Sequence, residues 1–491
     1  MRGNLWTRYH WLAVGCCLIV FGASGLIARF VLEEIPHLED EVTYLFQAQV
    51  FAVGRTHVDV PSEPNCFFAP GILNYEGRRF GKGSPGWPAL LSVGLRLGQA
   101  WWVNAAGAAL TVALVFRLGR DGHGALTGGL AAALAVSSPF LLILSGSLMS
   151  HTWCLVFCTG FLLCFYRART RPRDAAWAWG AGAMLGAAFA IRPFTAVAVA
   201  VPAGLYAGWR LLGHREWRVV WYLCLGFAPL ALLIPLFNAV WTGDPLLSPY
   251  VLFWPYDRIG FGPGTGTLPG GNTVLIGLSG AIAALGHLAN HLYGWPALSL
   301  SFAVGLFVFR PRRRWDLFLA ATVLSLILAY VAYWTSGDVF GPRYTYEIAS
   351  ALFVLSAAGI VRVGGWLRRR GKVWALTVAL SLLVGVNLAL YLPWQLREYR
   401  GLYGITARPR EILSRADVHN ALVIVSDQGG WYDYAVAFSM NVPTLDGDVV
   451  YANDCAPRND ELVALFAGRR VYYFDGERVR PYETGNVTGS Q

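Results

Sequence analysis

Charged side chains are scarce in this chain. Only 14% of its 491 residues are charged, whereas soluble domains average about 25%, and 55% are hydrophobic. The hydrophobic residues also form long runs, and about 20 apolar residues are enough to cross a bilayer core. This composition excludes an ordinary soluble domain and indicates an integral membrane protein.

Lysine is rarer still, because it occurs only at Lys82 and Lys372 among 39 basic residues. Internal repeats, low-complexity tracts and polar residues at mid-span are also lacking. Repeated halves and mid-span polar groups are typical of secondary transporters. Their absence argues against a polytopic transporter or lipid flippase, which is the alternative hypothesis for a chain with this many apolar runs.

The apolar runs predict an α-helical polytopic membrane protein with about eleven transmembrane helices. The first resembles a signal peptide, so a cleaved signal is the alternative to an uncleaved first helix. The expected spans are 11–32, 101–119, 124–144, 150–167, 175–191, 194–211, 217–238, 292–309, 316–334, 345–362 and 373–392.

The distribution of arginine predicts how these helices are oriented in the membrane. Segments such as 310–314 and 362–372 are basic, while the acids gather in the loops of the other side. Cytoplasmic loops carry the excess of Lys and Arg, so the N-terminus is expected in the cytoplasm and the C-terminus outside the plasma (inner) membrane. The net charge of +10 mostly reflects this bias, and no nucleic-acid partner is indicated.

Three long segments are expected on the outer side: 33–100, 239–291 and 394–491. The second is rich in Gly and Pro, and a helix lying on the membrane surface is expected from about residue 273. In the third, "ALVIVSD" and "RRVYYFDG" predict buried strands and "RNDELVALFAG" predicts a helix. We therefore expect a membrane domain over 1–393 and a small extracytoplasmic α/β domain over 394–491.

Most of the eight cysteines lie within predicted spans, but Cys66 and Cys455 fall in outer segments. A disulfide between them is compatible with that location. Nothing in the sequence shows that the two residues meet, so their pairing stays open here.

The first outer segment begins with an acidic cluster in "LEDEVTYLFQAQVFAVG". Its apolar residues recur at helical spacing and predict an amphipathic helix on the outer surface. Asp40, Tyr44 and Gln47 share one stripe of this helix, and Glu41 is rotated by about 100° from Asp40. Acids near a helix N-terminus are favourable, which could account for Glu39. Three carboxylates are more than capping of a helix N-terminus requires. Because carboxylates at a bilayer surface are costly, the cluster indicates a function.

The same segment carries positive charge in "NYEGRRFGKGSPGWPALL". Arg79 and Lys82 precede the next span, and Gly81 and Gly83 beside the lysine would let backbone approach a ligand closely. The alternative for Lys82 is an interfacial lysine that extends toward lipid headgroups.

Together these motifs resemble the GT-C glycosyltransferases, in particular the bacterial, family 39-like relatives of protein O-mannosyltransferases and aminoarabinose transferases. The resemblance rests on the Asp-Glu pair, Tyr44, the lysine followed by Pro85 and "GWPALL", and on "LMSHTW", "IRPF" and "FGPRYTYE". Two departures are the separation of the lysine from the proline and the small tail. They leave the substrate pair open.

The resemblance implies that a sugar moves from a polyprenyl-phosphate donor to a hydroxyl of a lipid, glycan or protein acceptor. A lipid phosphate leaves as a stable anion, so one carboxylate suffices as general base and the outcome is expected to be inversion. Asp40 is expected to be that base and Glu41 to support it. Lys82 is expected to bind the phosphate, with Arg343 as a second contact, unless Arg343 pairs with Asp338 or Glu347.

Tyr44, Arg79 and His151 complete the substrate-binding candidates, although His151 could simply pack in the bundle. Arg192, beside Pro193, either closes a helical hairpin or faces the cavity. No metal ligand is assigned: some GT-C enzymes require a divalent cation and others do not, and the carboxylates and His57 show no ligand spacing.

Overall fold

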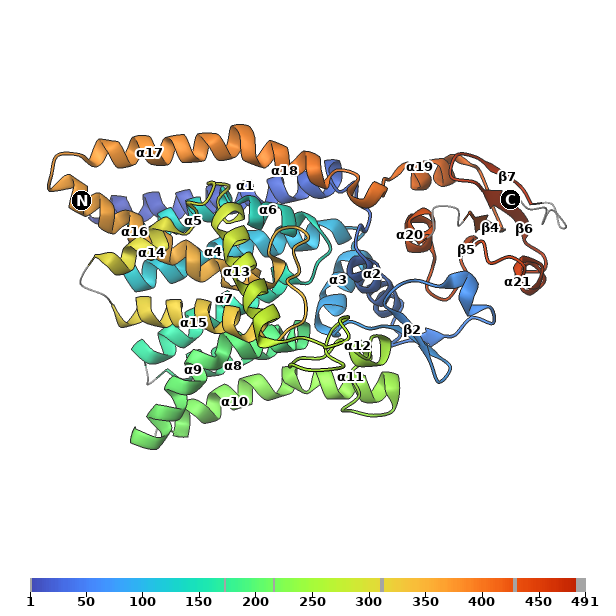
Figure 1. Cartoon of the computed structure of the whole chain (residues 1–491), viewed down its shortest axis with the longest axis horizontal. Coiled ribbons are helices and arrows are strands. Elements are labelled where there is room, and N and C mark those ends of the chain that lie inside the picture. The colour runs from blue at the N-terminus through green and yellow to red at the C-terminus, as the bar shows by residue number, and fades with distance from the viewer. Residues whose placement is uncertain (1, 172–173, 215–216, 310–312, 427–430, 483–491) are drawn as a thin grey trace.

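The computed structural model describes residues 2–482 apart from 172–173, 215–216, 310–312 and 427–430. A helical bundle forms most of the molecule, and a small sheet-containing unit lies at one end of it (Figure 1). The N-terminus lies at the opposite end of the bundle from that unit. The expected combination of a polytopic helical bundle and a small α/β unit is therefore present.

Helices α1 and α4 to α18 form the bundle, α2 and α3 belong to the first outer segment, and a π-helical turn, η4 (Asn387–Tyr391), lies between α17 and α18. In chain order they are α1 (Arg2–Phe30), α2 (Glu39–Ala52), α3 (Gly86–Arg96), α4 (Val103–His123), α5 (Ala125–Val136), α6 (Pro139–Gly146), α7 (His151–Thr170), α8 (Ala175–Ile191), α9 (Pro193–His214), α10 (Trp217–Ala231), α11 (Leu233–Thr242), α12 (Pro249–Phe253), α13 (Val274–His291), α14 (Ser301–Val308), α15 (Arg314–Tyr330), α16 (Ala349–Arg368), α17 (Val373–Val386) and α18 (Leu392–Tyr399).

Among the described residues, eight helices are long and apolar enough to cross a membrane, or nine if the bent pair α5–α6 counts as one span. The bend of 55° falls at Ser138-Pro139, where proline cannot continue a helix. Helix α8 coincides with the expected span 175–191, and α15 covers residues 316–330 of the expected span 316–334. Each has 17 residues, the lower limit for a span.

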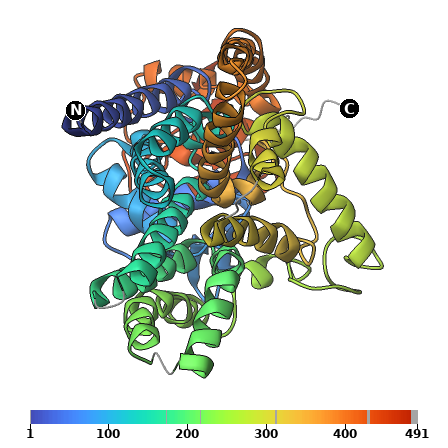
Figure 2. The ribbon, with the colours of Figure 1, turned by 90° about the vertical axis from the view of Figure 1, so that its left-hand side faces the viewer.

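The expected span 292–309 is wrong, because only α14 is helical there. Residues 292–300 form turns, in which Gly294 and Ala297 adopt positive φ angles of 64° and 56°. The helix expected from about residue 273 is present as α13, and it is long and apolar enough to span. Both views show α13 running across the direction of the neighbouring bundle helices (Figures 1 and 2).

The first outer segment folds into α2, α3 and a three-stranded antiparallel sheet in the order β1-β3-β2. Its strands are β1 (Val58–Asp59), β2 (Ile72–Tyr75) and β3 (Arg78–Gly81). Helix α2 does not lie on an open surface as expected, because most of its residues, including Val42, Phe46 and Val50, are buried. It lies between the bundle and the C-terminal unit (Figure 1).

The C-terminal unit is a four-stranded sheet in the order β5-β4-β6-β7 with three helices. Strand β4 is buried along its whole length and pairs in parallel with β5 and β6, which explains its unbroken apolar sequence. The elements are α19 (Arg408–Arg415), β4 (Ala421–Val425), α20 (Trp431–Met440), β5 (Val449–Asn453), α21 (Asn459–Leu465), β6 (Arg470–Phe474) and β7 (Val479–Pro481).

The first outer segment and the C-terminal unit share hydrophobic cores. Phe46 of α2 packs in one core with Phe438 of α20, and Phe67 packs in another with Leu422 of β4. A disulfide between Cys66 and Cys455 joins the same two parts across 389 positions of sequence. The pairing left open by the sequence is therefore present, and the tail acts as a cover for α2.

The orientation of the protein in the membrane can be tested by labelling single cysteines, with the six free cysteines replaced and the disulfide kept. Asn74→Cys and Glu461→Cys place exposed thiols at the outer end, and Arg369→Cys places one at the end of α16. We expect a membrane-impermeant thiol reagent to label the first two in spheroplasts and the third only after permeabilisation. The reverse pattern would contradict the predicted topology.

Candidate functional site

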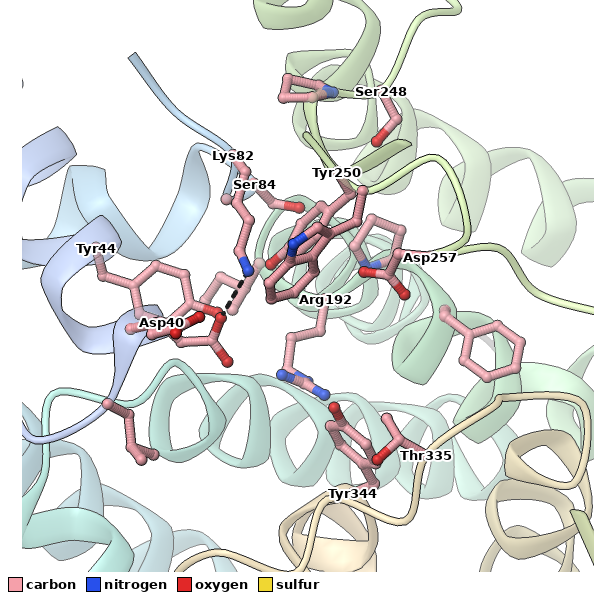
Figure 3. A pocket seen from close by; sticks show the side chains of 18 of the residues that line it. Asp40, Tyr44, Lys82, Ser84, Arg192, Ser248, Tyr250, Asp257, Thr335 and Tyr344 are labelled. Atoms are coloured by element: carbon pink, nitrogen blue, oxygen red, sulfur yellow. Dashed lines mark ion pairs between the residues drawn. The ribbon is translucent and has the colours of Figure 1, made fainter. Parts of the chain in front are cut away.

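A cavity of about 790 Å³ opens where the first outer segment meets the bundle. Its wall combines α2, the turn after β3, the break between α8 and α9, the segment around α12, and the segment from the end of α15 to the start of α16. Figure 3 shows how side chains from these separate elements converge. Of the expected residues it includes Asp40, Tyr44, Lys82, Arg192 and Arg343.

Asp40 stands between two cations in this cavity. One carboxylate oxygen lies 3.4 Å from Lys82 Nζ (Figure 3), and the other lies 3.7 Å from an Arg343 guanidinium nitrogen. Burial alone would raise the pKa of Asp40, but the charges of Lys82 and Arg343 outweigh burial and lower the pKa. Asp40 is therefore ionised at neutral pH and accessible from the cavity.

Hydrogen bonds to α2 and to its own loop hold the turn that carries Lys82. The backbone N–H of Gly81 donates to Gln47 Oε1 at 2.9 Å, and the N–H of Lys82 donates to Gly71 O at 2.8 Å. A Cβ at Gly81 would lie 2.9 Å from Thr43 Cγ2, and one at Gly83 would lie 2.8 Å from the Tyr44 ring. The glycines thus bring the chain close to α2, and Gly83 also lines the cavity.

The side chain of Lys82 points inward and is 1% exposed, which contradicts an extended interfacial lysine. Its amino group lies 3.4 Å from the centre of the Trp254 ring and 5.5 Å from that of Phe253. Apart from the ion pair with Asp40, Nζ has no hydrogen-bond partner among the described residues. A buried ammonium with spare donors is ready to bind an anion.

Glu41 is buried behind the cavity wall. Its Oε2 accepts from the N–H groups of His37 (2.9 Å) and Leu38 (3.1 Å), and its Oε1 accepts from the N–H of Leu148 (2.7 Å). Burial raises the pKa of Glu41 to about 7. Because all three contacts are with backbone, Glu41 fixes the N-terminus of α2 to the segment before α7 and so positions Asp40.

Arg343 pairs with Asp40, and neither alternative partner suggested by the sequence holds it. Asp338 instead lies 3.2 Å from His287, and Glu347 lies 3.4 Å from Arg192. The Nε atom of Arg343 has no hydrogen-bond partner among the described residues, although it is buried. Arg343 therefore retains donor capacity at the cavity wall.

Arg192 faces the cavity and also closes the break between α8 and α9, so both of its suggested roles are present (Figure 3). Its guanidinium contacts Tyr330 OH at 3.3 Å and is held by Glu347. His151 does not line the cavity. It is fully buried, with Nδ1 at 3.0 Å from Glu347 Oε1, so it supports Arg192 through that carboxylate and does not reach substrate.

Arg79 also lies outside this cavity. Strand β3 directs it toward the C-terminal unit. There it lines a second, smaller cavity and donates to Phe67 O, which belongs to the first outer segment. Neighbouring strand residues point to opposite faces, so Arg79 and Lys82 could not be assigned to one site from their proximity in sequence.

The sequence did not single out the aromatic wall of the cavity. Tyr250, Trp254, Tyr330 and Tyr344 line it, and Tyr330 stacks on Tyr344 with ring centres 5.0 Å apart. Asp257 completes the wall and accepts from Tyr333 OH at 2.8 Å and Trp334 Nε1 at 2.9 Å. The dense aromatic run "SPYVLFWPYD" is the signal in the sequence that could have identified this wall.

The donor set of the cavity does not fit a divalent cation. Asp40 already balances two cationic side chains, and no group of three His, Cys, Asp or Glu residues in the described chain could hold a metal. Positive charge in this cavity comes from Lys82, Arg192, Arg258 and Arg343.

No family model and no curated protein sequence matches this chain. Solved structures do match it. ArnT from Cupriavidus metallidurans in the apo state has a TM-score of 0.60 and 12% identity, covering 95% of this chain and 93% of that one. ArnT from the same organism bound to undecaprenyl phosphate has a TM-score of 0.59 and 13% identity, and the match covers 94% of this chain and 88% of that one. The oligosaccharyltransferase of Archaeoglobus fulgidus has a TM-score of 0.50 and 17% identity, and the match covers 85% of this chain and 61% of that one. The chain is thus similar in fold to these GT-C proteins.

The positioning role of Glu41 can be tested by thermal unfolding of the purified protein. Glu41→Ala removes an acceptor for three backbone N–H groups, and we expect a loss of at least about 3 kcal/mol in unfolding free energy. Glu41→Gln should lose less, since its amide oxygen still accepts. Wild-type stability of Glu41→Ala would contradict this role.

Proposed function

We propose that this protein is an inverting glycosyltransferase. It would move a sugar from a polyprenyl-phosphate donor to an acceptor hydroxyl at the outer membrane face. The observation that carries the proposal is the ionised Asp40 held between Lys82 and Arg343 in one cavity. The fold shared with ArnT, which has been crystallised with undecaprenyl phosphate, supports a lipid-phosphate donor.

In this proposal Asp40 accepts the proton of the acceptor hydroxyl as that oxygen attacks the anomeric carbon. The bond from that carbon to the phosphate oxygen breaks, and the lipid phosphate leaves with the electron pair. No proton is needed on the leaving group, so a second carboxylic acid is unnecessary. The sequestration of Glu41 by backbone N–H groups agrees with a single catalytic carboxylate.

The cations serve both partners of the reaction. Lys82 and Arg343 stabilise the charge that accumulates on the departing phosphate, because fixed positive groups in a water-poor site act strongly there. The charges of Lys82 and Arg343 lower the pKa of Asp40, and a donor phosphate bound to these cations would partly neutralise them. The pKa of Asp40 then rises, and donor binding makes the carboxylate a better base.

The aromatic wall suits the sugar. Rings such as Tyr330 and Tyr344 offer faces to the apolar side of a pyranose, and Asp257 offers a carboxylate to its hydroxyl or amino groups. The competing hypothesis, a transporter or flippase, requires neither a general base nor a chemical product, so assays of transfer separate the two.

Asp40→Asn should reduce transfer by about 10²- to 10⁴-fold while leaving donor binding largely intact. The amide keeps the shape of the side chain but cannot accept the proton. Transfer of labelled sugar from a polyprenyl-phosphate donor measures the effect, and Glu76→Gln, an exposed change in the same outer segment, is the matched control. An active Asp40→Asn together with an inactive Glu41→Gln would move the base to the second acid.

Lys82→Ala should weaken donor use by about 30- to 4,000-fold, the effect of removing one partner of a desolvated charge pair. Lys82→Arg should recover part of the loss, because the charge remains while the geometry changes. The readout is transfer at varied donor and at varied acceptor concentration. Lys372→Ala, which alters the other lysine of the chain at an exposed position, should behave like wild type. Direct use of a nucleotide sugar, or wild-type kinetics of Lys82→Ala, would overturn the lipid-phosphate mechanism.

A further inference from the structure

A second cavity of about 310 Å³ lies between the first outer segment and the C-terminal unit. Phe46 and Gln49 of α2 line one side, and Phe438 and Asn441 of the C-terminal unit line the other. It shares helices α2 and α20 with the cavity that contains Asp40 and Lys82, because Ala435 of α20 lines that cavity and Phe438 lines this one, but no residue lines both.

Arg79 is the buried charge of this second cavity, and its side chain is 3% exposed. One guanidinium nitrogen donates to Phe67 O, and another, NH1, has no hydrogen-bond partner among the described residues. The guanidinium lies 5.7 Å from the centre of the Phe46 ring and 5.9 Å from that of Phe438. The two rings thus orient the guanidinium of Arg79, but they accept no hydrogen bond from its unpartnered nitrogen.

No carboxylate neutralises Arg79 within the part of the chain that the structure describes. Glu63 lines the same cavity but pairs with Arg458 at 3.7 Å, and Asp59 is exposed at the edge. Burial lowers the pKa of Arg79 to about 10, so the guanidinium is still charged at neutral pH. A buried charge without a counter-ion is costly, which is difficult to explain for a residue that only packs.

We propose that the Arg79 cavity is a second binding site, which takes the carboxylate or phosphodiester group of a hydroxyl-rich solute. The planar guanidinium presents paired donors that match the oxygens of either group. Asn441 and Thr444 line the C-terminal side, where the Asn441 amide bonds the backbone of Tyr451 and the Thr444 hydroxyl donates to Asp446 Oδ1. Asp59 and Glu63 lie with Arg79 on the side of the cavity formed by the first outer segment. Their negative charges disfavour a dianion and favour a singly charged group that carries hydroxyls.

This site is independent of the proposed transfer reaction, so the test measures binding alone. The full-length purified protein, with its disulfide intact, is heated at constant ionic strength with glucuronate, with neutral glucose or with dimethyl phosphate. A ligand that binds only the folded state raises Tm, and the rise grows with the logarithm of 1 + [L]/Kd. We expect glucuronate or dimethyl phosphate to raise Tm and glucose to leave it unchanged, and the stronger of the two anions identifies the group recognised.

Variants assign the binding to Arg79. Arg79→Gln should weaken the anion by about 10- to 100-fold, since a charge-assisted hydrogen bond is removed. Lys372→Ala, an exposed change that lines neither cavity, should bind like wild type. Should Arg79→Gln fail to fold, Arg79→Lys keeps the charge and should still bind at least about threefold more weakly.

The proposal is overturned if neither anion raises Tm in the wild-type protein. It is also overturned if Arg79→Gln and Arg79→Lys bind with wild-type affinity, or if Lys372→Ala removes the response.

Discussion

The structure depends on keeping one carboxylate ionised and accessible in a place that is poor in water. Asp40 meets this constraint because Lys82 and Arg343 approach it from opposite sides, at 3.4 and 3.7 Å. Each cation comes from a different part of the chain, so the loop after β3 and the turn before α16 must be fixed relative to α2. The hydrogen bonds of Gln47 and Glu41 with backbone N–H groups provide much of that fixation.

The C-terminal unit also helps to hold Asp40 in place, because it packs against α2. It buries the outer face of α2 through Phe438 and is fastened to the first outer segment by the Cys66–Cys455 disulfide. An amphipathic helix on an open surface could tilt or slide, and a tilt of α2 would separate Asp40 from Arg343. A helix with cores on both sides keeps the edge that carries Asp40 in register with the bundle.

Local patterns in the sequence predicted the elements, but not how distant elements meet. Hydropathy located most spans, and the Asp40–Tyr44–Gln47 stripe was correctly placed on one face, because helical periodicity is a local property. The separation of Arg79 from Lys82 depends on strand alternation and on a C-terminal unit that covers one side. The partner of Arg343 and the role of Trp254 depend on contacts between segments about 300 and 170 positions from α2 or β3, which no spacing reveals.

Helix α2 gives the two cavities a common physical element. Asp40 lies in its first turn, and Phe46 and Gln49 lie six and nine residues later, or about 9 and 14 Å along the axis. A solute in the second cavity can influence the first by binding more tightly to one placement of α2, or of α20, than to another. Such a preference is plausible on physical grounds, because Arg79 stacks on Phe46 and an anion drawn to the guanidinium would restrain both. Occupancy of the second cavity would then reduce the motion of Asp40 relative to its cations, without any contact with the reacting atoms.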